Sequence, residues 1–113
     1  MPPGSPLELL RGTLDLMILR VLAPGPLHGY AIATAIQQRS DETLLVEEGA
    51  LYPALHRLEG RGCVEADWGV SENNRRARYY ALTAEGRREL RARVRDWERY
   101  VTAVDKVLAP AEA

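Results

Sequence analysis

The apolar residues of this chain change their spacing after residue 60, and this change restricts the folds open to it. From residue 7 to residue 60 they recur every three or four positions, as in helices that bury one stripe. The stretch "CVEADWG" then alternates apolar and polar residues, and "ARYYALT" can pair with it across a tip at Asn73-Asn74, which tolerate left-handed backbone geometry. The chain is therefore predicted to be mainly α-helical with a small β-hairpin. Trp68, on the apolar side of its strand, is expected in the core.

Three helices are expected before the hairpin. The apolar stripe of the first consists of Leu7, Leu10, Leu14, Met17 and Val21. Gly12 is a candidate break, with Thr13 capping the main helix. "HGYAIATAIQQRS" resumes the helical period after the "APGP" turn, and a β-leaning piece follows at residues 44–46. "GALYPALHRLEGRG" is the third helix, expected to start near Gly49 because Pro53 is tolerated at a helix start.

The last segment is typical of one long helix with a second apolar stripe. Thr83 can cap it, and Glu85 places an acid in its first turn. The stripe follows a 4, 3, 4, 3, 4 spacing and consists of Leu90, Val94, Trp97, Val101, Val104 and Leu108. A domain this small cannot cover the whole stripe, so we expect a second copy of the chain to do so. Residues 84–108 are therefore predicted to be the dimerisation helix of a homodimer.

Composition and charge argue against several classes of function. The formal net charge is −1, so any affinity for nucleic acid must lie in a local basic patch. The sequence starts without a secretion signal and has a lone Cys63, so we expect a cytoplasmic protein. Asp15 and Arg20 interrupt the best apolar run, which argues against a membrane span. His28, His56 and Cys63 lack zinc spacing, and no catalytic motif is apparent, so no metal, cofactor or enzymatic activity is expected.

Three helices followed by a hairpin are the order of a winged helix-turn-helix, in which the third helix enters the major groove of double-stranded DNA. The hairpin, or wing, touches the neighbouring backbone or minor groove. Opposite its leucines, the third helix should present Ala50, Tyr52, Pro53, His56 and Arg57. The wing offers Asn74, Arg75, Arg76 and Arg78. Both sets are candidate DNA contacts.

These assignments have alternatives. The basic tip could be an ordinary solvated loop, Tyr52 could be a half-buried packing residue, and Arg57 could pair with Glu59 or Glu48. The whole fold could also be a protein-interaction module whose third helix and wing meet an acidic protein surface without reading duplex sequence. A basic hairpin directly after a helix with these outward residues is rarer by chance than either feature alone, which favours DNA.

Three stretches resemble the PadR family of bacterial transcriptional regulators: "GTLDLMILRVLAPGPLHGYAIATAIQQ", "EEGALYPALHRLEGRGCVEADWG" and "ENNRRARYYALTAEGRREL". The similarity runs from about Leu7 to Leu108. The short chain with one C-terminal helix resembles the small subgroup of the family. It implies a homodimeric winged-helix regulator, usually a repressor, whose third helix and wing bind an operator and whose last helix exchanges contacts with the partner. Two departures stand out: Asn73-Asn74 occupy positions where glycine is common, and Gly49-Ala50 stand where glycine-serine is common.

The resemblance also suggests an effector site. In small members of the family a tryptophan at a place similar to Trp97 lines a pore between protomers and binds flat aromatic compounds. Arg93 and Tyr100 lie near Trp97 in the sequence and are candidate contacts for such a ligand. The alternative is that Trp97 only fills the dimer seam.

The chain is thus expected to comprise a flexible arm (1–6), a winged helix-turn-helix DNA-binding domain (7–83), the dimerisation helix (84–108) and a tail (109–113). The function predicted from the sequence is a repressor that binds a pseudo-palindromic operator as a homodimer and is released by a small aromatic effector.

Overall fold

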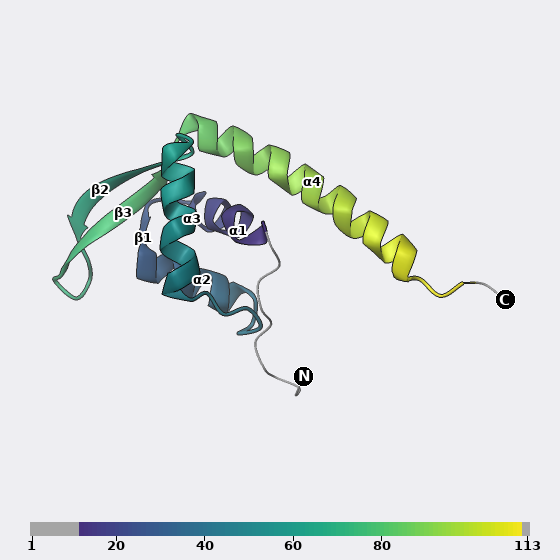
Figure 1. The fold of residues 1–113 in the computed structure, drawn as a ribbon. Helices are drawn as coiled ribbons and strands as arrows, with labels where there is room; N and C mark the ends of the chain where they lie inside the picture. The colour runs from purple at the N-terminus through teal and green to yellow at the C-terminus, as the bar shows by residue number, and fades with distance from the viewer. Residues whose placement is uncertain (1–11, 112–113) are drawn as a thin grey trace.

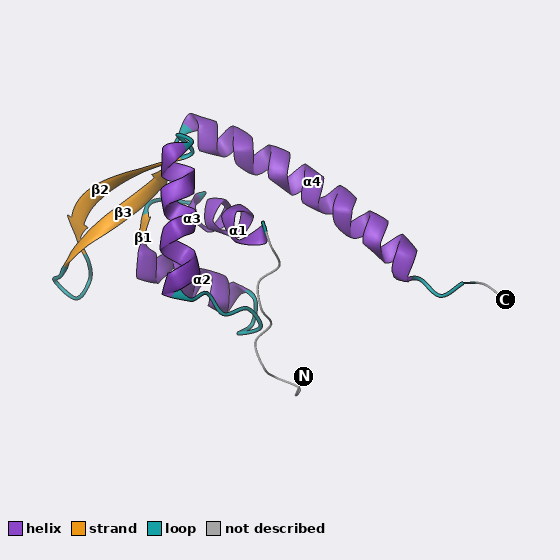
Figure 2. Ribbon diagram, in the orientation of Figure 1, coloured by secondary structure: helices purple, strands orange, loops and turns teal. Residues whose placement is uncertain are grey.

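The computed structural model describes residues 12–111, which form four helices and three strands (Figures 1 and 2). In chain order these are α1 (Thr13–Leu22), β1 (Leu27–His28), α2 (Gly29–Arg39), α3 (Glu48–Gly60), β2 (Val64–Val70), β3 (Arg76–Leu82) and α4 (Ala84–Leu108). The predicted order of three helices, a hairpin and one long helix is confirmed. The predicted arm, with Leu7 and Leu10, lies outside the described residues.

The sheet has one strand more than the sequence indicated. Its order is β1-β3-β2, with β3 antiparallel to both neighbours, and β1 pairs Leu27 with Tyr80 and His28 with Tyr79. A strand of two residues has no alternation that sequence analysis could detect. The expected strand near residues 44–46 is not formed, because this segment contributes only an isolated bridge at Leu44 and a buried Val46.

The core lies among α1, α2 and α3 and is closed by the inner ends of β2, β3 and α4. The large aliphatic side chains that are fully buried are Ile18, Leu19, Leu22, Ile32, Leu51, Leu55 and Leu58. Burial of each contributes about 1.5–3 kcal/mol relative to exposure. The predicted leucine stripe of α3 therefore faces inward, and the opposite face of α3 is left to solvent.

The start of α1 differs from the prediction. Gly12, not Thr13, is the N-cap, with a left-handed φ of 85°, and Thr13 is the first helical residue. A side chain other than glycine rarely adopts this φ, so the chain turns into the helix at Gly12. Asp15 lies in the first turn of α1 and is buried.

The outer half of the wing extends past the helices (Figure 1). Asn74 has a φ of 58°, which confirms the left-handed tip, and the amide of Ser71 donates to the carbonyl of Arg75 at 2.8 Å. The prediction that Trp68 is buried in the core is wrong, because 58% of its surface is exposed. Val64, at the inner end of the same strand, is buried against the helices, whereas Trp68 lies beyond their reach.

The long helix α4 leaves the domain after its first turns (Figure 1). The Thr83 hydroxyl accepts from the amide of Gly86 at 3.0 Å, which confirms the predicted cap. Along the predicted seam Leu90 is buried, Trp97 is 38% exposed and Leu108 is 72% exposed, while Val101 and Val104 are half-buried. No helix within residues 12–111 combines the length and apolar character needed to cross a membrane.

Candidate functional site

A hollow of about 710 Å³ separates the start of α2 and the exposed side of α3 from the wing. Aromatic and basic side chains line it together: Tyr30, Tyr52, Trp68, Arg75, Arg76 and Arg78. The packing of α3 against the core provides one wall, and the pairing of β2 with β3 provides the other. Of the residues predicted from the sequence, this hollow brings Tyr52 of α3 together with Arg75, Arg76 and Arg78 of the wing. The other predicted residues do not line it: Ala50, Pro53, His56, Arg57 and Asn74.

The exposed face of α3 is the one the sequence predicted. All five candidates are solvent-exposed: Ala50, Tyr52, Pro53, His56 and Arg57. Pro53 lies within the helix. It has no N–H to donate to the carbonyl of Gly49, four residues earlier, yet α3 continues to Gly60.

Arg57 is held by an ion pair that the sequence did not indicate. Its Nη2 lies 3.0 Å from Oδ1 of Asp15, whose side chain is 9% exposed. A buried carboxylate without a partner is strongly destabilising, so Arg57 satisfies Asp15 and fixes α3 against α1. The guanidinium is still 52% exposed and has five N–H donors, so it can bind a further anion from the solvent side.

Tyr52 both packs and faces the hollow. Its ring lies against Gly29 at the start of α2, where a Cβ would stand 2.6 Å from the tyrosine hydroxyl. A larger residue at position 29 would therefore displace the Tyr52 ring from this contact. Because 43% of the ring remains exposed, Tyr52 can also contact a bound molecule.

The wing arginines fall into two groups. Arg78 Nη2 is 2.9 Å from Oε2 of Glu59, which ties β3 to the last turn of α3. Arg75 and Arg76 are exposed and make no ion pair within residues 12–111. Asn74 at the tip is exposed as well. Arg75 and Arg76 therefore carry the available positive charge of the wing.

Trp68 supports one of these arginines. The guanidinium carbon of Arg76 lies 4.4 Å from the centroid of the indole, a cation–π arrangement between diagonal neighbours on β2 and β3. The indole holds the cation at the edge of the hollow. This role of Trp68 is not visible in the sequence, because strand alternation cannot show where the covering helices end.

His28 joins the wing to the start of α2. Its Nδ1 accepts the amide proton of Ala31 at 3.1 Å, so the ring caps α2. Nε2 therefore carries the proton and lies 3.3 Å from Oε1 of Glu72 in the wing turn. The ring also meets Tyr79 edge-on, with centroids 5.4 Å apart. The position of His28 directly before the helical stretch was the sequence signal that could have indicated this capping role.

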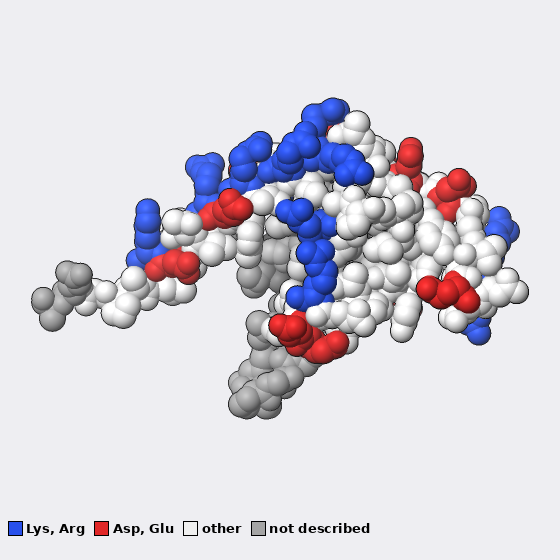
Figure 3. Space-filling model, turned by 180° about the vertical axis from the view of Figure 1, so that it is seen from behind, with Lys and Arg blue, Asp and Glu red and all other residues white. Residues whose placement is uncertain are grey.

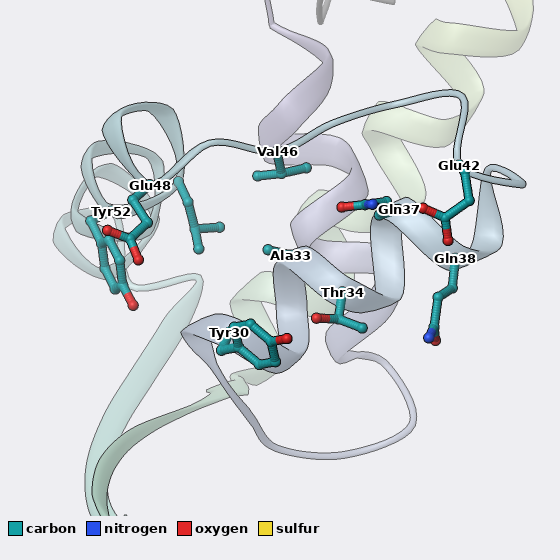
Figure 4. Close-up of a pocket in the computed structure, with 10 residues that line it drawn as sticks. Tyr30, Ala33, Thr34, Gln37, Gln38, Glu42, Val46, Glu48 and Tyr52 are labelled. Atoms are coloured by element: carbon teal, nitrogen blue, oxygen red, sulfur yellow. Dashed lines mark hydrogen bonds between the residues drawn. The ribbon is translucent and has the colours of Figure 1, made fainter. Parts of the chain in front are cut away.

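A smaller hollow of about 360 Å³ lies between α2 and the start of α3 (Figure 4). Tyr30 and Thr34 line it from α2, and Glu48 and Tyr52 line it from α3. The Gln37 amide donates to Glu42 at 2.6 Å at one end. Its lining is about equally polar and apolar, and through Tyr30 and Tyr52 it adjoins the larger hollow.

The candidate effector residues lie together at the junction of α1 and α4. Arg93, Trp97 and Tyr100 line a hollow of about 690 Å³ that also touches Gly12 and Leu16. The rings of Trp97 and Tyr100 are 6.2 Å apart, and Arg93 Nε is bound to Oε1 of Glu89 at 2.7 Å. The aromatic surface is therefore open, while the Arg93 charge is partly compensated.

Cys63 lies away from these hollows and is buried. Burial raises the pKa of its thiol, and Glu89 and Glu85 raise it further, so the thiolate is disfavoured. This matches a small buried apolar residue. The described part of the chain contains no group of three or more metal-ligating side chains.

A model of the transcriptional regulator PadR-like family matches residues 18–92, from α1 into α4. Transcriptional regulator Rv3488 of Mycobacterium tuberculosis is 36% identical over 83 residues, which are 74% of each chain. The structure of a transcriptional regulator from Clostridium thermocellum has a TM-score of 0.80 at 32% identity, covering 88% of this chain and 96% of its own. A PadR family transcription regulator from Clostridium difficile R20291 has a TM-score of 0.75 at 27% identity, covering 87% and 100%. These matches confirm the winged-helix fold.

The exposed position of Trp68 predicts a small effect of its removal on stability. Trp68→Ala should lower the free energy of unfolding by about 1 kcal/mol or less, the loss of one exposed cation–π contact. Removal of a core tryptophan would cost about 3–5 kcal/mol. Urea unfolding of both proteins measures the difference, with Leu55→Ala as a buried control expected to cost about 2–5 kcal/mol. A loss for Trp68→Ala as large as for Leu55→Ala would contradict the exposed placement.

Proposed function

We propose operator binding and repression by a homodimer as the function of this chain, which belongs to the transcriptional regulator PadR-like family. That membership makes it a transcriptional regulator. The observation that carries the proposal is the hollow between α3 and the wing, with an exposed helix face on one side and two uncompensated arginines on the other. This shape suits a duplex whose major groove receives the helix while the wing follows the backbone.

In this proposal α3 reads the bases. Tyr52, His56 and Arg57 project from its free face, and the buried leucines fix that face outward. Arg57 has donors left after its bond to Asp15, and a fixed guanidinium suits a guanine edge or a phosphate. Ala50 and Pro53 are small enough to let the helix approach the groove closely.

The wing supplies affinity that does not depend on sequence. Arg75 and Arg76 would each neutralise a phosphate and release counterions, and Asn74 at the tip would bond the backbone. Trp68 would hold Arg76 in place for this contact. A local patch of this kind is compatible with a net charge of −1.

The proposed dimer rests on α4. Its seam is buried at Leu90 and exposed at Trp97 and Leu108, with Val101 and Val104 half-buried between them, and a second copy would bury it. Two copies related by a two-fold axis would present two α3 helices to successive major grooves. The operator would then be a pseudo-palindrome with half-sites one or two helical turns apart, about 10 bp each.

A winged-helix protein-interaction module is the alternative, in which the same hollow meets an acidic protein surface. Salt weakens both kinds of complex, whereas only binding to DNA depends on the base sequence of the partner. The aromatic and basic lining of the hollow would serve either partner, so sequence dependence decides between them.

DNA binding is tested with a labelled fragment of the upstream region of the gene and a shuffled duplex, by fluorescence anisotropy. We expect preference for the native fragment. Arg75→Ala/Arg76→Ala should weaken binding to both duplexes and lower the salt slope by about 2, since each phosphate contact contributes about 0.9. Arg39→Ala/Arg61→Ala removes equal charge from the ends of α2 and α3 and should change little. Equal binding to both duplexes, with no consensus selected from a random pool, would favour the interaction module.

The proposed effector is a flat aromatic compound at Trp97. Its support is the hollow of about 690 Å³ that brings Trp97 and Tyr100 together with Arg93. In the dimer this ligand would alter the separation of the two α3 helices and so lower operator affinity. Titration with such compounds should quench tryptophan fluorescence and weaken operator binding together, and Trp97→Ala should abolish both effects. Quenching without a change in operator affinity would show that the sites are not coupled.

A further inference from the structure

The strongest unassigned charge on the molecule is a line of basic side chains along α4. Seen from behind, Lys and Arg side chains gather along the outer edge of this helix (Figure 3). We call this the basic row and define it as Arg88, Arg91, Arg95, Arg99 and Lys106, all of them exposed. Their spacing in the sequence places them on one side of α4, turned away from the apolar seam. The basic row therefore stays exposed when the seam is covered by a second copy.

The row is electrostatically unfavourable for the helix itself. Arg88, Arg91, Arg95 and Arg99 follow one another at spacings of three or four residues, where like charges on a helix repel. Arg88 is paired with Glu85 at 2.6 Å, and Arg99 is 4.0 Å from Asp96. Arg91, Arg95 and Lys106 have no ion pair in the described part of the chain. These three side chains are therefore available to an external anion.

The composition of the row identifies the kind of anion. The other residues beside the row are Ala84, Glu98, Thr102 and Ala103, so this side of α4 contains neither aromatic nor large apolar side chains. Single-stranded nucleic acid is held by stacking, protein interfaces are centred on aromatic or apolar anchors, and membrane-surface helices bury an apolar face. The row offers none of these. Four of its five members are arginine, whose fork suits phosphate oxygens.

We infer that the basic row binds the phosphate backbone of a second duplex, separate from the one held by α3 and the wing. The row spans about 27 Å at 1.5 Å per residue, long enough to contact several phosphates. It runs along α4 away from the wing, so one dimer could hold an operator on its winged-helix faces and another DNA segment on its helices (Figure 3). This inference extends the proposed function. The bridging of two duplexes rests on operator binding by α3 and the wing, whereas phosphate binding by the basic row does not.

The first test measures anisotropy of a labelled random-sequence duplex over a range of salt concentrations. Arg91→Gln/Arg95→Gln should weaken binding and lower the salt slope by about 2, because two phosphate contacts are lost. The control Arg39→Gln/Arg61→Gln removes the same charge and should bind like the unchanged protein. The change relieves repulsion within α4, so the helix should persist, as circular dichroism can verify. Equal behaviour of the two variants would overturn the inference.

The second test detects bridging by energy transfer between a donor-labelled upstream fragment and an acceptor-labelled random duplex. The unchanged protein should give transfer, and Arg91→Gln/Arg95→Gln should lose it while retaining its preference for the upstream fragment. If the unchanged protein bound the upstream fragment no better than the random duplex, the proposed operator function would be refuted. The salt-slope measurement would then decide whether the basic row binds DNA. Binding to phosphatidylserine vesicles that depends on Arg91 and Arg95, with duplex binding unaffected, would assign the row to a lipid surface and contradict the inference.

Discussion

The burial of one leucine stripe on α3 is the constraint on which the rest of the structure depends. Leu51, Leu55 and Leu58 are almost fully enclosed, and a helix that buries one stripe must expose the opposite one. The Asp15–Arg57 ion pair then fixes the rotation of α3 relative to α1, since a buried carboxylate requires its partner. The outward face of α3 is therefore a consequence of the core rather than a separate feature.

The wing and α4 begin where that core ends. β2 is buried at Val64 and exposed at Trp68, so the sheet provides both an inner closure of the core and an outer arm. Arg78 and His28 fasten this arm to α3 and α2 through Glu59 and Glu72, which leaves Arg75 and Arg76 free to meet a ligand. In α4, apolar and basic residues occupy different sides, so a partner chain and an anion can be bound at once.

Features that depend on residue spacing and residue type within one segment could be predicted from the sequence. The leucine stripe of α3, the Thr83 cap and the left-handed Asn74 follow from spacing and residue type, and the structure has them. Contacts between distant segments could not be predicted from a single sequence. The Arg57–Asp15 pair joins residues 42 positions apart, and Trp68 looked like a core residue because alternation does not show how far the covering helices reach. The two-residue β1 was too short to leave a pattern.

The central claim is that two copies joined through α4 present two α3 helices to one operator. Hydroxyl-radical footprinting of the protein on its operator measures this directly. A dimer of this kind should protect two symmetric half-sites with centres about 10 or 20 bp apart, as two-fold related helices in successive major grooves require. One short asymmetric footprint at saturating protein would show that a single protomer binds alone, and would contradict the account.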